Sequence, residues 1–221
     1  MNVVGLVDGS DPSLKEEAVI IGAHFDHIGV DREGKAFPGA SDNASGVAGI
    51  LEIARSFASA RVKPKRSILF LAFTGEEPGW RIGSEYYVKH PLIPLEKTVA
   101  MINLDMIGTP GFPTVVGEKG AVPMRDIAEQ ASEIIEVKLK YLCDGAKIMA
   151  LLSNGREIVV SHPVSDHITF RDKKIPPFFC TPGICPDLHQ TTDTWDKLDP
   201  VKLEEIARLD FLVAWGVAQM R

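Results

Sequence analysis

Three runs of almost uninterrupted apolar residues constrain the fold of this chain more than any other feature. They cover residues 18–23, 66–73 and 98–104. A strand with one face in water alternates apolar and polar residues, whereas a strand covered on both faces is apolar along its length. A helical stripe with a period of about 3.6 residues separates the first two runs, from Asn43 to about Ala60. Strands that alternate with helices predict a three-layer α/β sandwich, with the sheet between two layers of helices.

The remaining segments continue this alternation. Further strands are predicted at residues 3–7, 114–116, 158–160 and 178–180, and further helices at 83–88, 122–135, 165–171 and 200–220. Asp42 or Asn43 is suited to cap the helix that begins there. The proline- and glycine-rich stretches 108–113 and 176–186 read as loops rather than linkers. We therefore expect one domain over residues 1–221.

Charge and hydropathy argue against two classes of partner. The net charge is −6 and the pI is about 5.5, with no cluster of lysine and arginine. A nucleic-acid partner is therefore not expected. No apolar run reaches the roughly 18–20 residues that span a bilayer, so a membrane partner is not expected either.

The N-terminus begins almost at once with a strand-like run and lacks the basic and apolar regions of a secretory signal. Such a start is compatible with an upstream segment that has been trimmed. The expected location depends on that segment: outside the cytoplasm if a signal was removed, and cytoplasmic otherwise.

Cysteine usage does not indicate a disulfide framework. Cys143, Cys180 and Cys185 are too few for one. We expect buried free thiols. A bridge between Cys180 and Cys185 is left open, because its geometry cannot be tested on the sequence.

Acidic and histidine residues follow the apolar runs, where α/β sheets carry their sites. In chain order they are His24, Asp26, Asp42, Glu76, Glu77, Asp105 and His189. Each has an ordinary interpretation on its own: Asp42 as a helix cap, Glu76 and Glu77 as a solvated pair, Asp105 as a turn cap, His189 as a surface residue. Two adjacent carboxylates after a buried strand would repel each other unless a cation lies between them. Together these positions indicate a metal site.

With these residues the chain resembles peptidase family M28, the di-zinc aminopeptidases. The matching motifs are His-x-Asp, Ser-Asp-Asn-Ala-Ser-Gly, Gly-Glu-Glu, Asn-Leu-Asp-Met-Ile-Gly and His-x-x-x-Asp-Thr, and they run in order through nearly the whole sequence. The resemblance implies a mixed, twisted sheet of about eight strands between α-helices. It also implies a cis peptide between Asp42 and Asn43.

The resemblance assigns roles to the residues at the strand ends. His24 and Asp105 would bind one metal ion, Glu77 and His189 the other, and Asp42 would be shared. Asp26 is similar to an aspartate that orients the ligating histidine, and Glu76 to the general base. Two histidines and three carboxylates suit Zn²⁺ and tolerate Co²⁺ or Mn²⁺.

The implied activity is removal of N-terminal residues from peptides. Two zinc ions would hold a hydroxide and polarise the carbonyl. Glu76 would take the proton of the attacking water and deliver it to the leaving amine. The expected partners are peptides with a free N-terminus.

The resemblance also points to residues near the substrate. Ser165, Asp166 and His167 match a Ser-Asp-His-x-x-Phe segment of the family, although Ser165 is equally suited to be a plain helix cap. Some relatives carry a tyrosine just upstream that helps to stabilise the oxyanion; residues 161–164 contain none, so that role is unfilled or passes to His167 or the metals. Trp80 is a candidate for the substrate pocket or an ordinary packed aromatic. The other histidines (His27, His90 and His162) lack a partner pattern and are interpreted as ordinary residues.

Three alternatives stay open. A glutaminyl cyclase has a related fold and one zinc, which the complete two-ion ligand set argues against. A carboxypeptidase or dipeptidase would need a cation for the substrate carboxylate, and Arg81, Arg156 and Arg171 are candidates. A non-catalytic binding module would have lost the ligands that are present here.

Overall fold

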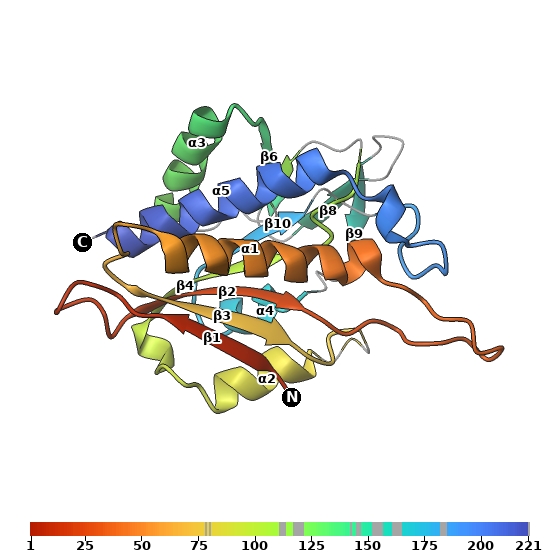
Figure 1. The fold of residues 1–221 in the computed structure, drawn as a ribbon, viewed down its shortest axis with the longest axis horizontal. Coiled ribbons are helices and arrows are strands. Elements are labelled where there is room, and N and C mark those ends of the chain that lie inside the picture. The colour runs from red at the N-terminus through yellow and green to blue at the C-terminus, as the bar shows by residue number, and fades with distance from the viewer. Residues whose placement is uncertain are drawn as a thin grey trace.

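A mixed β-sheet forms the middle layer of the molecule (Figure 1). The computed structural model describes residues 1–77, 79, 81–110, 114–116, 122–141, 143–144, 147–151, 157–160, 165–181 and 185–220. Within these residues the main sheet has seven strands, in the order β1 (Val3–Val7), β3 (Ser67–Phe73), β2 (Ala18–His24), β4 (Thr98–Leu104), β10 (Pro177–Thr181), β5 (Thr114–Val116) and β6 (Leu139–Tyr141). The four central strands β3, β2, β4 and β10 are parallel, whereas β1 and β5 run antiparallel to their central neighbours.

The strand count differs from the expected figure of about eight. Three further strands, β7 (Cys143–Asp144), β8 (Lys147–Leu151) and β9 (Glu157–Val160), pair antiparallel with one another as a separate sheet. Every predicted strand is present within one or two residues. The short strands β6, β7 and β8 were not predicted.

Helices cover both faces of the main sheet. Helices α1 (Gly46–Ser59), α3 (Val122–Ile135) and α5 (Pro200–Gln219) lie on one face, and α2 (Ile82–Lys89) and α4 (His167–Arg171) lie on the other (Figure 1). Three short helical segments, η1 (Ala40–Ser45), η2 (Leu95–Lys97) and η3 (Trp195–Lys197), complete the helical elements among the described residues. The predicted three-layer α/β sandwich is confirmed.

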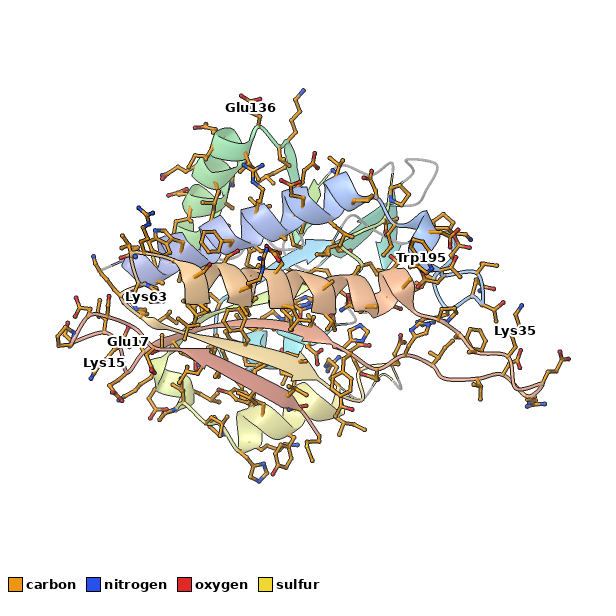
Figure 2. The ribbon with its side chains drawn as sticks, viewed as in Figure 1. Lys15, Glu17, Lys35, Lys63, Glu136 and Trp195 are labelled. Atoms are coloured by element: carbon orange, nitrogen blue, oxygen red, sulfur yellow. The ribbon has the colours of Figure 1, made fainter. Side chains whose placement is uncertain are left out.

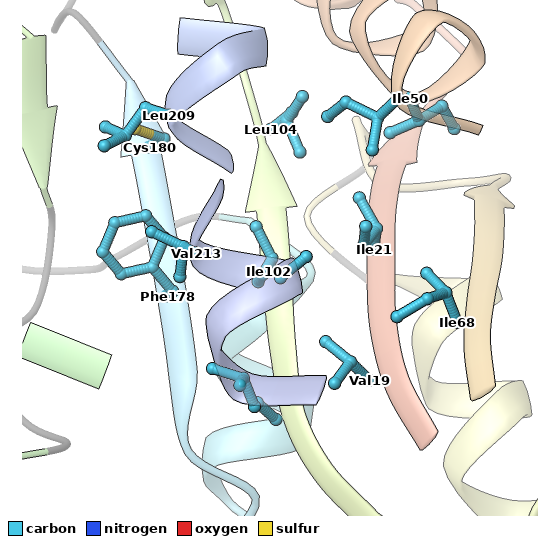
Figure 3. Packing of buried hydrophobic residues seen from close by; sticks show 14 of the residues in the cluster. Val19, Ile21, Ile50, Ile68, Ile102, Leu104, Phe178, Cys180, Leu209 and Val213 are labelled. Carbon is cyan, nitrogen blue, oxygen red and sulfur yellow. The ribbon is translucent and has the colours of Figure 1, made fainter. Parts of the chain in front are cut away.

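The two cores explain the apolar runs. Val19 and Ile21 of β2 pack toward α1 and α5, whereas the alternate residue Ile20 packs toward α2 and α4. Figure 3 shows the first of these cores, with Val213 of α5 over the strands. All seven residues of β2 are buried. Each fully buried isoleucine or valine contributes about 1.5–3 kcal/mol relative to exposure, which fixes this strand in the middle of the sheet.

The connection between β2 and α1 leaves the body and then returns to the sheet. It projects outward, with Lys35 near its far end (Figure 2), and comes back through η1 (Ala40–Ser45). The peptide between Asp42 and Asn43 is cis, as the resemblance implied.

Asn43 joins the start of α1 to the end of β4. Its Oδ1 accepts hydrogen bonds from the amides of Gly46 (2.9 Å) and Met106 (3.2 Å), and its Nδ2 donates to the carbonyl of Leu104 (2.9 Å). The N-cap position of α1 is Ser45, which makes no side-chain cap hydrogen bond; Asn43 instead accepts from the amide of Gly46, the first residue of the helix. A Cβ at Gly46 would overlap Asn43 and the Leu104 carbonyl, so this close approach requires glycine.

None of the helices in the described residues is long and apolar enough to cross a membrane.

Candidate metal centre

The carboxyl ends of the parallel strands lie at one edge of the sheet. His24 is the last residue of β2 and pairs with Phe73, the last residue of β3. Gly22 pairs with Asn103 of β4, so His24 and Asp105 lie level with each other two residues further on. This shared edge is where open α/β sheets bind ligands.

The five predicted ligands lie together, with Asp42 in the middle. The Nε2 atom of His24 lies 3.2 Å from Asp42 Oδ1, and the Nε2 atom of His189 lies 3.4 Å from Asp42 Oδ2. Asp105 Oδ1 is 3.5 Å from His24 Nε2, and Glu77 Oε2 is 2.9 Å from His189 Nε2. Asp42 thus stands between two histidine–carboxylate pairs.

The cluster concentrates negative charge in a buried place. The side chains of Asp42 and Asp105 are 7% exposed and that of Glu77 is 5% exposed. Burial and the charge of Asp42 raise the pKa of Glu77 to about 7. Burial opposes the charged imidazole of His24, but Asp105 and Asp42 outweigh it and raise the pKa of His24 to about 12. Burial also acts against the Asp42 carboxylate, yet hydrogen bonds from His189 and His24 lower its pKa overall.

These residues fit a divalent cation. His24, Asp42 and Glu77 each offer a ligand atom, and the three atoms lie within 4.8 Å of one another. Asp105 Oδ1 is buried and accepts no hydrogen bond from the described residues. Imidazole nitrogens and carboxylate oxygens are among the ligands that bind zinc in proteins. A cation would remove the repulsion among the carboxylates.

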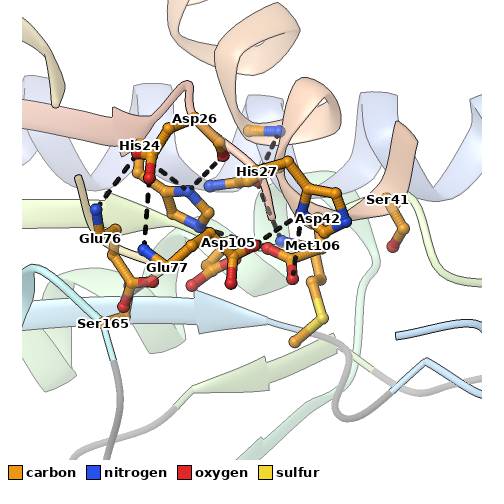
Figure 4. A network of polar contacts seen from close by, with 12 residues as sticks. His24, Asp26, His27, Ser41, Asp42, Glu76, Glu77, Asp105, Met106 and Ser165 are labelled. Atoms are coloured by element: carbon orange, nitrogen blue, oxygen red, sulfur yellow. Dashed lines mark hydrogen bonds and ion pairs between the residues drawn. The ribbon is translucent and has the colours of Figure 1, made fainter. Parts of the chain in front are cut away.

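Asp26 contacts His24 through its backbone carbonyl and the Glu76–Glu77 turn through its carboxylate. Its backbone carbonyl lies 3.2 Å from His24 Nδ1, whereas its carboxylate is 3.9 Å from that atom. The two carboxylate oxygens accept hydrogen bonds from the amides of Glu76 (3.2 Å) and Glu77 (3.3 Å), as Figure 4 shows. The carboxylate predicted to orient His24 is thus engaged mainly by the Glu76–Glu77 turn, and the backbone of Asp26 is the nearer partner of His24.

Glu76 lies beside the ligands without joining their contacts. It is buried, and its Oε1 has no hydrogen-bond partner among the described residues. Burial and the nearby charge of Asp105 raise the pKa of Glu76 to about 9. Without metal ions such a carboxyl keeps its proton at neutral pH; the positive charge of bound cations would lower its pKa and free the carboxylate to act as a general base.

Two residues of the site were missed by the sequence analysis. His27 lies in the cluster, with its Nδ1 2.6 Å from Glu77 Oε1. Asp193 accepts hydrogen bonds from the amides of Ser41 (2.8 Å) and Asp42 (3.1 Å). The run His-Phe-Asp-His and the motif His-x-x-x-Asp-Thr were the available signals, since each contains the missed residue and a predicted ligand.

Backbone geometry marks two of the loops at the site. His189 and Met106, which follows Asp105, both have φ of 56°. Non-glycine residues in this left-handed region are uncommon and cluster at functional sites.

The predicted substrate residues Ser165, Asp166 and His167 are buried. The Ser165 hydroxyl accepts a hydrogen bond from Asn103 Nδ2 at 2.7 Å and does not cap α4. His167 stacks on Phe179 with ring centroids 4.2 Å apart. Contact of these residues with a substrate stays a prediction. Trp80, Arg156 and His162 lie outside the described residues.

The described cysteines agree with the expectation of buried thiols. Cys180 and Cys185 are both free and buried.

The buried imidazole of His167 leads to a prediction about acid stability. Burial lowers the pKa of His167 from 6.5 to about 3. Between these values the unfolded chain binds a proton that the folded chain does not, so stability is lost as the pH falls, by at most about 1.4 kcal/mol per pH unit. In metal-free protein, urea unfolding should show a steeper loss from pH 6.5 to 4.5 for the wild type than for His167→Phe, which keeps a ring on Phe179. An equal loss of unfolding free energy per pH unit in the two proteins would contradict the lowered pKa of His167.

The fold and the cluster define an α/β protein with a candidate metal centre at the carboxyl edge of its sheet. The chain matches the model of peptidase family M28 over residues 2–214, and it belongs to that family.

Known proteins agree with this membership. The chain is 28% identical over 215 residues to a probable leucine aminopeptidase of Arthroderma otae, which covers 94% of this chain and 56% of that protein. A zinc aminopeptidase from Bacillus subtilis has a similar structure, with a TM-score of 0.77 and 22% identity, over 100% of this chain and 50% of that chain. A glutaminyl cyclase of Bacteroides thetaiotaomicron, determined with N-acetylhistamine, has a TM-score of 0.70 and 18% identity, over 97% of this chain and 76% of that chain. The last two likenesses establish the fold alone. The chain spans about half the length of the first relative.

Proposed function

We propose that this chain is the catalytic part of a zinc aminopeptidase that removes N-terminal residues from peptides. The observation that carries the proposal is the convergence of two histidine–carboxylate pairs on Asp42, with Glu76 buried beside them. The family and the aminopeptidase names of similar proteins support this activity.

His24 and Asp105 would hold one zinc ion, Glu77 and His189 the second, and Asp42 both. Co²⁺ or Mn²⁺ could replace zinc, because the donor set is of borderline hardness. When bound, such ions lower the pKa of water and polarise a carbonyl.

Glu76 would carry the protons of the reaction. It would accept a proton from the attacking water and donate it to the amine of the leaving peptide. Asp26 fixes the backbone of Glu76 through the amide hydrogen bond, so the carboxylate is positioned by a rigid turn. The burial of Glu76 excludes bulk water that would otherwise compete for the proton.

The carboxylates would also select the substrate. With the charge of the carboxylates offset by bound ions, a free N-terminal amine can donate N–H hydrogen bonds to a carboxylate oxygen and keeps a basic lone pair, whereas an acetylated N-terminus has a single N–H and no basic lone pair.

Aminoacyl anilides and their N-acetylated counterparts provide the direct test. We expect hydrolysis of free-amine anilides, loss of activity with a chelator and recovery on adding zinc. The acetylated compounds should react at least about 100-fold more slowly, which corresponds to roughly 2.7 kcal/mol. Preference for acetylated substrates with a free carboxylate would instead indicate a carboxypeptidase or dipeptidase.

The likeness to a glutaminyl cyclase fold keeps a second candidate in view. Elemental analysis separates the two functions. Two ions per chain support the peptidase, and one ion with cyclisation of an N-terminal glutamine would support the cyclase.

A further inference from the structure

His27 follows Asp26 in sequence, yet its ring turns back into the cluster. Its Nδ1 lies 2.6 Å from Glu77 Oε1 and 3.9 Å from Asp42 Oδ2, and its side chain is 10% exposed. The remaining oxygen of Glu77 faces His189, with 2.9 Å between Glu77 Oε2 and His189 Nε2. The two oxygens of Glu77 are thus divided between the two histidines.

The ring of His27 is held by the segments that carry the ligands. Gly39 has φ of 64°, and a Cβ there would lie 2.7 Å from His27 Cγ and 2.7 Å from the Asp42 carbonyl oxygen. The imidazole therefore lies directly on the backbone that leads to Asp42. From another side it meets the ring of His189 edge-on, with centroids 5.7 Å apart.

The second ring nitrogen distinguishes His27 from the ligand His24. A metal-bound histidine almost always donates its other N–H to an acceptor. His24 has such an acceptor, the Asp26 carbonyl, 3.2 Å from its Nδ1. His27 Nε2 is buried and has no partner among the described residues. A proton on Nδ1 avoids an orphaned buried N–H and makes that atom a donor to Glu77.

We propose that His27 is a positioning residue: it donates from Nδ1 to Glu77 Oε1, turns the other oxygen toward His189, and so sets the affinity of the second metal position. This rests on the proposed two-ion function. Loss of a hydrogen bond to a metal-ligating carboxylate typically lowers metal affinity about 10–100-fold.

Metal titration of variants tests the role without measuring turnover. His27→Ala removes the ring, His27→Phe keeps a ring on Gly39 without a donor, and His27→Asn supplies an amide N–H in a similar place. His90→Ala is the control, because His90 stacks on Tyr86 in an exposed position away from the cluster. Metal-free samples are first compared by circular dichroism and thermal unfolding, and folded variants are titrated with Zn²⁺ by calorimetry and with Co²⁺ by visible absorption.

We expect wild type and His90→Ala to bind two ions. The Ala and Phe variants should bind the first ion normally and the second about 10–100-fold more weakly, and the Asn variant should recover most of that loss. Unchanged second-ion affinity in a folded Ala or Phe variant would overturn the role of His27. A folded Asn variant as weak as the others would also overturn it, because the imidazole would then act as a ligand. Binding of only one ion by the wild type would overturn the two-ion function itself.

Discussion

Replacement of Glu76 with glutamine is expected to lower kcat about 10²–10⁴-fold, the usual contribution of a positioned acid–base group. The side chain is buried, and its Oε1 has no hydrogen-bond partner among the described residues, so it is free to contact a water molecule held in the site. Glutamine has the same shape but cannot accept the proton. Turnover of an aminoacyl anilide, measured with zinc in excess, provides kcat.

Metal content separates this effect from damage to the site. Glu76→Gln should keep the metal stoichiometry of the wild type, because Glu76 is beside the proposed ligands and not among them. Glu96→Gln serves as the control at an exposed position of η2. If Glu76→Gln retained most of its activity with full metal, Glu76 would not be the base.

Replacement of Asp42 with alanine is expected to abolish both metal binding and activity. Asp42 contacts His24 and His189 with its two separate oxygens, at 3.2 and 3.4 Å. Its loss therefore affects both proposed ion positions, whereas loss of His189 would affect one. In elemental analysis the variant should retain less than one ion per chain after desalting.

Thermal unfolding adds an independent measurement. Zinc that binds only the folded state should raise the Tm of the wild type. At a free zinc concentration of 100 times Kd, the free energy of unfolding increases by about 2.7 kcal/mol. The Tm of Asp42→Ala should not respond to zinc. Asp172→Ala, at an exposed position after α4, should respond like the wild type. A normal zinc shift in Asp42→Ala would show that the ions bind elsewhere.

The central strands of the sheet could be predicted from the sequence, because their position depends mainly on the pattern of apolar residues. Strands β2, β3 and β4 are buried on both faces, and their apolar runs mark their bounds within about a residue. Parallel strands end at one edge, so the residues that follow them meet there. For that reason His24, Glu77 and Asp105 could be assigned to one site.

Other features depend on contacts that pattern does not encode. The hydrogen bond of His27 to Glu77 joins residues 50 positions apart, and that of Asp193 to the Ser41 amide joins residues 152 apart. Both depend on side-chain rotamers and on the path of irregular loops. In the sheet of β7, β8 and β9 only β9 was predicted; β7 has two residues, which is too short for an alternating pattern to be recognised.

Asn43 has a mechanical consequence for the whole centre. Its three hydrogen bonds lock the first turn of α1 and the end of β4 into one rigid block. Asp42 precedes Asn43 in the chain, and Asp105 lies between the two β4-side residues that Asn43 contacts. The spacing between these two carboxylates is therefore set by the packing of a helix on a strand. A site framed in this way loses little conformational freedom when it is filled, so more of the interaction energy remains as affinity.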